Sequence, residues 1–202
     1  MVDFFVQGGG FMWPILIALL FGLAVIGERA YSLINSSSDT DQFFEDVKTM
    51  YSDSGKEQAL EFCENSPGPV ASIFYAGLSK MERTKEEIEK AVQNAGGLEM
   101  AFLEKNMIWI NSVITIAPML GFTGTVVGMI KAFEDIKMAN DISPAVVAGG
   151  ISQALLTTAF GLIVAMIMQV AQNFFVSMID KLILDMEEQS IKIVEYLYSS
   201  KK

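Results

Sequence analysis

The sequence predicts an all-α membrane protein with three transmembrane helices and long helices that extend into the cytoplasm. Three blocks without a charged residue carry this prediction: residues 4–27, 106–130 and 142–179. Each block is longer than the roughly 20 apolar residues that cross the hydrocarbon core of a bilayer. Between the blocks, apolar residues recur at helical spacing and no strand pattern is found.

The composition excludes several classes of function. The chain has no histidine, one cysteine and a net charge of −10. Imidazole bases, intrachain disulfides and thiolate clusters are therefore excluded, and no basic run offers a nucleic-acid site. Cys63 is expected to be a small buried apolar residue. Without a paired acid and base, a nucleophile elbow or a phosphate loop, we expect no enzyme, no metal site and no cofactor.

The first element is predicted from the N-terminal block. We assign residues 1–10 to a periplasmic N-terminus and residues 11–33 to the first transmembrane helix. Trp13 and Tyr31 suit the two membrane interfaces, and Pro14 is tolerated near a helix start. Since no positive residue precedes the apolar run, we expect a retained anchor and not a cleaved signal.

Residues 34–106 are predicted to form a cytoplasmic helical domain. The run Ser36–Asp39 is typical of a helix start, and Pro67–Pro69 interrupts the helical pattern. Thr84 with Glu87 three residues later fits a capping box. From there an apolar pattern continues to the second span. We therefore expect one helix that begins in the cytoplasm and enters the membrane, with Gly96–Gly97 as a point where it could bend.

The second half of the chain contains the other two spans. We assign residues 107–131 to the second transmembrane helix, 132–143 to a periplasmic loop, 144–175 to the third transmembrane helix and 176–202 to a cytoplasmic C-terminal helix. Ser143 and Pro144 fit the N-cap and first position of a helix. The 38 uncharged residues from Ile142 would reach about 57 Å as a helix. This exceeds a bilayer core of about 30 Å, so the helix should continue beyond the membrane.

The basic residues predict the orientation. Of the 14 Lys and Arg residues, two lie on the side of residues 1–28 and 131–141, and twelve lie on the side of residues 29–105 and 180–202. Basic residues accumulate on the cytoplasmic side of membrane proteins. We therefore expect a multi-pass protein of the bacterial inner membrane, with a periplasmic N-terminus and a cytoplasmic C-terminus.

The second and third spans carry hydroxyl and amide groups but no charge. Thr115 and Thr125 share one face of the second span, and Ala154, Thr158, Gly161 and Ala165 share one face of the third. Gly124-x-x-x-Gly128 is a close-packing motif. One interpretation is tight helix packing. The other is a polar ion path, which would need a titratable residue from a partner because these spans have none.

Two segments resemble a known family. Ala117–Ile130 and Gly149–Leu162 are similar to the signature segments of the MotA/TolQ/ExbB proton-channel family, and Trp13-Pro14 with Glu28-Arg29 is similar to its ExbB-type members. The flagellar branch typically has four spans, so three spans favour an ExbB or TolQ type.

The resemblance implies a mechanism. Family members form five-fold rings around a two-copy single-span partner of the ExbD/TolR type, whose intramembrane aspartate takes and releases protons. Ion flow rotates the ring against this partner, and the motion is transmitted to a TonB/TolA-like periplasmic protein. Thr125 and Thr158 match the family's pore threonines. The expected ion-pathway residues are Thr125, Thr158, Thr157, Gln153 and Thr115, and the expected helix-packing residues are Gly121, Gly124, Gly128, Ala154, Gly161 and Ala165.

The sequence departs from the family pattern at two positions, and the first of them affects the expected ion because a charge is lost. Many relatives have glutamate at the position of Gln153 and proline at the position of Ile167. We expect H⁺ as the transported ion, with Na⁺ as the alternative. The alternative functions are a TolQ-like or gliding-motility stator subunit, or a membrane scaffold that does not conduct.

Overall fold

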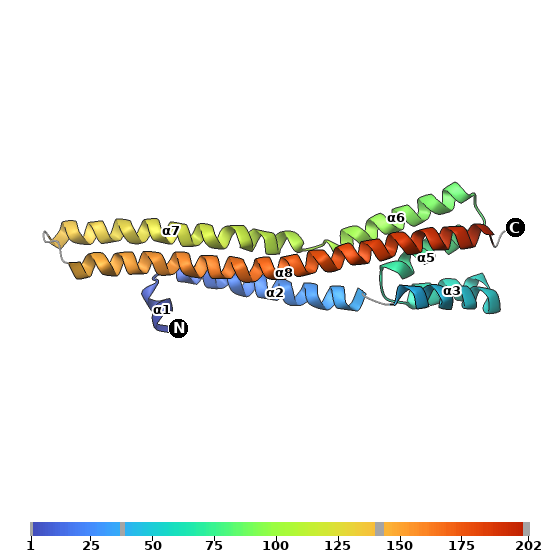
Figure 1. Cartoon of the computed structure of the whole chain (residues 1–202), viewed down its shortest axis with the longest axis horizontal. Coiled ribbons are helices and arrows are strands. Elements are labelled where there is room, and N and C mark those ends of the chain that lie inside the picture. The colour runs from blue at the N-terminus through green and yellow to red at the C-terminus, as the bar shows by residue number, and fades with distance from the viewer. Residues whose placement is uncertain (1, 37–38, 140–143, 200–202) are drawn as a thin grey trace. The chain divides into compact units, whose positions relative to one another are not determined.

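The computed structural model describes residues 2–36, 39–139 and 144–199, and these residues form helices and turns without a strand (Figure 1). The helices in chain order are α1 (Val2–Gln7), α2 (Met12–Ser36), α3 (Thr40–Ser54), α4 (Lys56–Asn65), α5 (Pro69–Ser79), α6 (Lys85–Leu103), α7 (Met107–Ala139) and α8 (Pro144–Ser199). The all-α prediction is confirmed.

The chain divides into two compact units. The first comprises residues 1–29 and 106–174, and the second comprises residues 30–105 and 175–202. Helix α8 contributes to both, because it runs for 56 residues, or about 84 Å. This confirms the prediction that the third helix is longer than a membrane span. The N-cap predicted at Ser143 lies outside the described residues.

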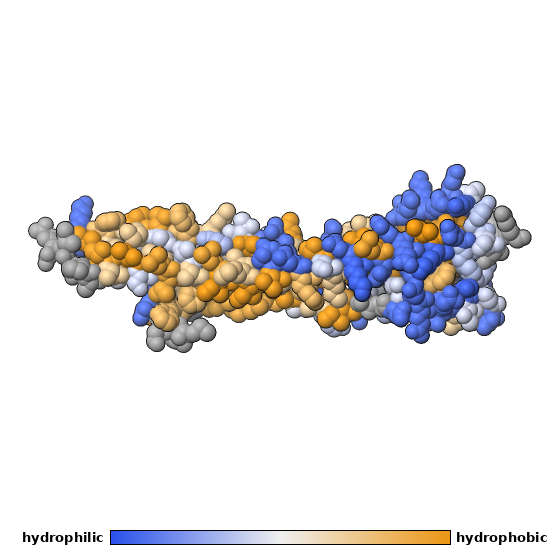
Figure 2. Space-filling view, viewed as in Figure 1, coloured by the Kyte–Doolittle hydropathy of each residue, from blue (hydrophilic) through white to orange (hydrophobic). Residues whose placement is uncertain are grey.

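The first unit has an apolar exterior. Figure 2 shows its side chains largely in the hydrophobic colours. Three helical stretches are long and apolar enough to cross a membrane: Met12–Ser36, Lys85–Met138 and Val147–Ser199. Ile17, Phe122 and Val170 each expose 64% or more of their surface. Large apolar side chains on the outside suit hydrocarbon and not water. The chain is a multi-pass membrane protein.

Helices α7 and α8 are antiparallel and approach closely at small residues. A Cβ added to Gly161 would lie 2.5 Å from the carbonyl oxygen of Ala117, and one added to Gly121 would lie 2.9 Å from that of Thr157. Nearer the other end, a Cβ added to Gly150 would collide with the Cβ of Ala132. Only glycine fits such contacts. They allow the backbones of the two membrane helices to come into direct contact.

The second unit has a buried apolar core. Helix α5 packs against α4 and α6, and α3 packs against α4. Phe74 is fully buried, with its ring centroid 5.5 Å from that of Phe43 and 5.8 Å from that of Phe44. The apolar stripe of the C-terminal part of α8 is buried as its spacing indicates, at Ile179, Leu182, Met186, Ile193 and Leu197.

The local helix signals of this unit are confirmed. The backbone N–H of Gln42 donates to the side chain of Asp39, the N-cap of α3. Thr84 and Glu87 form the capping box that starts α6. Cys63 is buried, and burial raises the pKa of its thiol to about 12. Its role as a small apolar core residue follows.

Two boundaries differ from the sequence predictions. The expected continuous helix into the second span is interrupted: α6 ends at Leu103, a turn covers Glu104–Asn106, and α7 begins at Met107. Asn106 has φ 65°, a left-handed conformation that asparagine tolerates better than most residues. Gly96–Gly97 lies within unbroken helix. In the segment 132–143, where the sequence predicts a loop, α7 continues as a helix as far as Ala139.

Candidate functional site

The candidate site is a cluster of four oxygen atoms between α7 and α8. The hydroxyl groups of Thr125 and Thr158 are hydrogen-bonded to each other. Thr158 Oγ1 also lies 3.1 Å from the carbonyl oxygen of Gly121, and Thr125 Oγ1 lies 3.1 Å from that of Ala154. Both threonines are half-buried. The two threonines that the sequence singles out therefore lie together.

The cluster has more acceptors than protons. Each hydroxyl carries one proton and can accept as well as donate. The two protons serve two carbonyl oxygens and the two hydroxyl oxygens, and Thr125 Oγ1 also lies 3.3 Å from the carbonyl oxygen of its own helix at Gly121. Such a group can rearrange its hydrogen bonds when a water molecule, a proton or a small cation comes within reach. It has no charge of its own.

Thr157 occupies a different place from Thr158. It is 2% exposed, and its hydroxyl donates to the carbonyl oxygen of Ala154 at 2.8 Å. A Cβ added to Gly124 would lie 2.7 Å from Thr157 Oγ1 and 3.2 Å from the Cβ of Phe11. Thr157 thus lies in the close contact between α7 and α8, next to the turn residue Phe11, and its hydroxyl approaches the four-oxygen cluster only through the shared carbonyl oxygen of Ala154.

Gly128 and Ala154, two more of the predicted packing residues, lie at the same helix contact. A Cβ added to Gly128 would lie 3.2 Å from that of Ala154. Ala165 is buried farther along α8. Together with Gly121, Gly124 and Gly161, these residues place small side chains along both helices. The hydroxyl cluster is therefore held by backbone that is itself closely packed.

The other two predicted ion-pathway residues lie apart from the cluster. Thr115 is exposed, and its hydroxyl donates to the carbonyl oxygen of Asn111 at 3.0 Å. Gln153 lies one turn before Thr157 on α8, where it lines a pocket and abuts Gly9. Gly9 has φ 74°, and a side chain there would collide with the Gln153 amide.

The pocket beside Gln153 contains two charged residues that sequence reasoning missed. Its volume is about 240 Å³, and it is lined by Gly128, Lys131, Ala132, Asp135, Gly149, Gly150 and Gln153. The sequence prediction places Lys131 at the end of the span and Asp135 in the loop after it. A loop residue has no fixed place on a helix face, so the prediction does not relate the two residues to the cluster. The signal was present, because Asp135 follows Thr125 on that face by helical steps of three and four residues.

A second polar group lies near the other end of the first unit. Arg29 is 1% exposed, and its guanidinium forms an ion pair with the Glu28 carboxylate through Nε at 2.7 Å and a second nitrogen. Asn106 Nδ2 donates to the same carboxylate at 3.2 Å. A buried arginine requires such pairing. The ion pair lies at the end of the part of α2 that belongs to this unit. The bond from Asn106 connects this end to the turn that precedes α7.

The second unit has an electrostatic contact between α3 and α8. Asp41 accepts hydrogen bonds from Lys192 at 2.7 Å and Gln189 at 2.8 Å. The bond from Lys192, followed by that from Gln189, lowers the pKa of Asp41. Hydrogen bonds with Asp41 and Glu188 raise the pKa of Lys192. The contact joins the first turn of α3 to α8.

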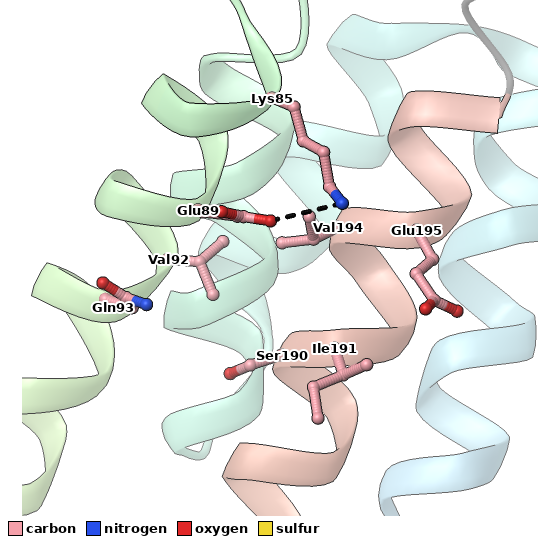
Figure 3. Close-up of a pocket in the computed structure, with 8 residues that line it drawn as sticks. All are labelled: Lys85, Glu89, Val92, Gln93, Ser190, Ile191, Val194 and Glu195. Atoms are coloured by element: carbon pink, nitrogen blue, oxygen red, sulfur yellow. Dashed lines mark ion pairs between the residues drawn. The ribbon is translucent and has the colours of Figure 1, made fainter.

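The second unit also has a pocket between α6 and α8, with a volume of about 310 Å³. Figure 3 shows Lys85 and Glu89 of α6 forming an ion pair among the lining residues, with Val194 of α8 beside it. The Lys85 Nζ to Glu89 Oε1 distance is 3.5 Å. These groups form a surface pair at i and i+4. They supply no convergent set of acid, base or nucleophile.

The fold and the candidate site define a class: a helical membrane protein whose close helix contacts carry hydroxyl groups. A sequence model of the MotA/TolQ/ExbB proton channel family matches residues 65–188. The chain belongs to this family.

Curated relatives are of the ExbB and TolQ types. The chain is 29% identical to "Putative biopolymer transport protein ExbB-like 3" of Synechocystis sp. over 85% of this chain and 82% of that protein. It is 29% identical to "Putative biopolymer transport protein ExbB homolog" of Methanothermobacter thermautotrophicus over 89% of this chain and 64% of that protein. It is 29% identical to "Tol-Pal system protein TolQ" of Pseudomonas aeruginosa over 55% of this chain and 54% of that protein.

Proposed function

We propose that this chain is the ring-forming subunit of an ion-driven energiser in the bacterial inner membrane. The observation that carries the proposal is the hydroxyl cluster of Thr125 and Thr158. It lies between two helices whose membrane-spanning parts contain no charged residue. The names of the ExbB-type and TolQ-type relatives support a role in TonB- or Tol-type transport. The energy of the ion gradient would be passed to a TonB/TolA-like protein.

The proposed complex is a homopentamer around an ExbD/TolR-like partner with one transmembrane helix. Proton conduction normally needs an ionisable group inside the membrane. Residues 106–130 and 142–179 have none, so the partner must supply it, and the resemblance to the family implies an aspartate. One chain has three spans, too few to enclose a partner helix, which favours a ring of copies. Native mass spectrometry of the purified complex tests this: five copies are expected, and a monomer as the main species would contradict the proposal.

The proposed ion is H⁺, with Na⁺ as the alternative. Hydroxyl and carbonyl oxygens can hydrogen-bond water along a proton path and can also ligate a hard cation. Gln153 lines the pocket without adding a charge. Energisation measured in medium without Na⁺, at constant membrane potential and pH, separates the two ions. Retained activity is expected if protons are used.

The proposed orientation places the N-terminus in the periplasm and the second unit in the cytoplasm, on the distribution of basic residues. The native thiol is a poor probe, because Cys63 is buried and its pKa is raised to about 12. A Cys63→Ser chain carrying Gln58→Cys offers an exposed thiol on α4. A membrane-impermeant maleimide should label it only after the cytoplasmic face is opened. Labelling in intact spheroplasts would reverse the orientation.

The decisive experiment removes one hydroxyl from the cluster. Thr158→Val keeps nearly the shape of threonine and deletes the oxygen that could hold water or an ion. We expect loss of transport driven by the ion gradient, with normal yield of the complex. Thr158→Ser restores an oxygen and should retain partial activity.

Two controls separate the cluster from general effects of hydroxyl removal. Thr123→Val makes the same change at an exposed hydroxyl, which donates to the carbonyl oxygen of Met119 at 2.8 Å. Thr157→Val makes it in the packing contact beside the cluster. Both should be milder than Thr158→Val. Normal activity of Thr158→Val would leave the hydroxyl with a structural role and favour a scaffold that does not conduct.

A further inference from the structure

The pocket near the end of α7 and the start of α8 has a composition that suits an opening to solution. Its volume is about 240 Å³. Gly128, Ala132, Gly149 and Gly150 line it with little more than backbone, and the amide of Gln153 is neutral. The charge of this pocket therefore comes from its two ionisable lining residues, Lys131 and Asp135. Both side chains are exposed.

The pocket lies in line with the hydroxyl cluster along α7. Thr125, Gly128, Ala132 and Asp135 follow one another by three, four and three residues, so they share one face of the helix. Lys131 is six residues beyond Thr125 and Asp135 is ten, or about 9 Å and about 15 Å along the axis. Lys131, which also lines the pocket, therefore lies about one turn nearer Thr125 than Asp135 does.

The two charges act separately on such an ion. Within the described residues, no ion pair joins Lys131 to Asp135, although they are spaced four residues apart on the helix. A recess with protein walls focuses the field of the charges that line it and changes the local concentration of small ions. An ammonium group lowers the local concentration of cations, and a carboxylate raises it.

We propose that this pocket is the outer vestibule of the ion path, and that Lys131 and Asp135 set cation access to the hydroxyl cluster in opposite directions. The inference rests on the proposed function and adds to it a pair of residues that determine ion access. Lys131 has the larger effect, because it lies nearer Thr125. The ammonium group of Lys131 repels cations, so a higher external ion concentration is needed to supply the path. The carboxylate of Asp135 attracts cations, so a lower external concentration is enough.

The first experiment measures the charge of the pocket without using activity. Cys63→Ser removes the only native thiol. Gly149→Cys then places one thiol in the pocket, at a position where an added Cβ meets no atom within 4 Å. In right-side-out vesicles containing the assembled complex, the reaction rates with a cationic and an anionic methanethiosulfonate are compared. Their ratio reports the local potential.

The expected changes in this ratio have opposite signs. Lys131→Gln should raise the cationic-to-anionic rate ratio about threefold, and Asp135→Asn should lower it about twofold. Glu134→Gln and Lys137→Gln are matched controls, because they change the same charges on the same helix outside the pocket lining. Equal effects of control and pocket variants, or shifts of one sign, would overturn the proposal. A Gly149→Cys thiol that neither reagent modifies would show that the pocket is closed to the outside and would also overturn it.

The second experiment measures ion access through activity in chains that keep Gly149 and Cys63. The external concentration of H⁺ or Na⁺ that gives half-maximal energisation is determined at constant membrane potential. Lys131→Gln should lower it and Asp135→Asn should raise it, each by more than the maximal rate changes. Energisation of the wild type that depends on neither ion would refute the proposed function. Ion-dependent energisation with unshifted half-maximal concentrations in both variants would refute the vestibule alone.

Discussion

The two units of this protein differ in where they place many of their large apolar side chains. In the first unit, Phe122 and Val170 are 68% and 72% exposed, while the contact between α7 and α8 is made of glycine, alanine and threonine. In the second unit, Phe74 and Ile73 are fully buried and charged residues cover the surface (Figure 2). Each unit therefore matches a different solvent.

The comparison teaches which forces hold each unit together. Lipid removes most of the hydrophobic gain from helix association, so the first unit depends on close backbone contacts and hydrogen bonds. Water supplies that gain, so the second unit depends on its aromatic core. Helix α8 follows both rules along one uninterrupted helix: small residues such as Gly161 are buried in its first part, and large ones such as Leu197 in its last.

The largest expected effect comes from the core of the second unit. Phe74→Ala removes a ring that is fully buried and contacts Phe43 and Phe44. We expect the free energy of unfolding to fall by about 3–5 kcal/mol, because the transfer energy is lost and a cavity remains. Thermal unfolding of the full chain, followed by near-ultraviolet circular dichroism, measures this. Tyr75→Ala, at an exposed neighbouring position, is the control, and equal losses for the two variants would remove the distinction between core and surface.

A smaller effect is expected from a methyl group in the first unit. In Gly161→Ala the new Cβ lies 2.5 Å from the carbonyl oxygen of Ala117, so α7 and α8 must separate. We expect a loss of about 1–3 kcal/mol. Gly149→Ala adds the same methyl where no atom lies within 4 Å, and should be neutral or stabilising by up to about 1 kcal/mol. The melting temperature in nanodiscs compares them. If both variants melt like the wild type, close glycine contacts do not hold this unit.

The smallest effect concerns the contact of Asp41 with α8. Hydrogen bonds from Lys192 and Gln189 lower the folded-state pKa of Asp41 below 3.8. A depressed carboxylate pKa gives stability that is present above the unfolded pKa and lost as pH falls through the folded value. Asp41→Asn should therefore lower the melting temperature slightly at pH 7, and the difference from wild type should shrink as the pH falls below 3.8 and disappear below the folded-state pKa. Asp46→Asn, on the same helix, is the control. A difference that persists unchanged in acid would assign the effect to packing and not to charge.

Several elements could be predicted from the sequence because their cause is local. Asp39 and Thr84 start helices through bonds to residues three positions ahead. The buried stripe at the end of α8 follows from its spacing. The break at Asn106 could not be predicted this way. The apolar pattern continues through it, and the stabilising bond from Asn106 reaches Glu28, 78 residues away.

The candidate site shows the same division. Resemblance to the family singled out Thr125 and Thr158, and the structure brings their hydroxyls together. Thr157 could not be separated from Thr158 by residue type alone. Only the packing of α7 against α8 places the Thr157 hydroxyl against Gly124 and the Thr158 hydroxyl against that of Thr125.

The sequence by itself determined the membrane class, the number of long apolar helices and the helix starts, because hydropathy and capping act over a few neighbouring residues. The tertiary structure alone decided which polar groups meet. The four-oxygen cluster needs α7 and α8 to approach within backbone distance, and the pocket needs Lys131 and Asp135 of α7 to face Gln153 of α8. Such contacts join residues about 20 to 40 positions apart. They depend on how two helices pack against each other, which no local pattern contains.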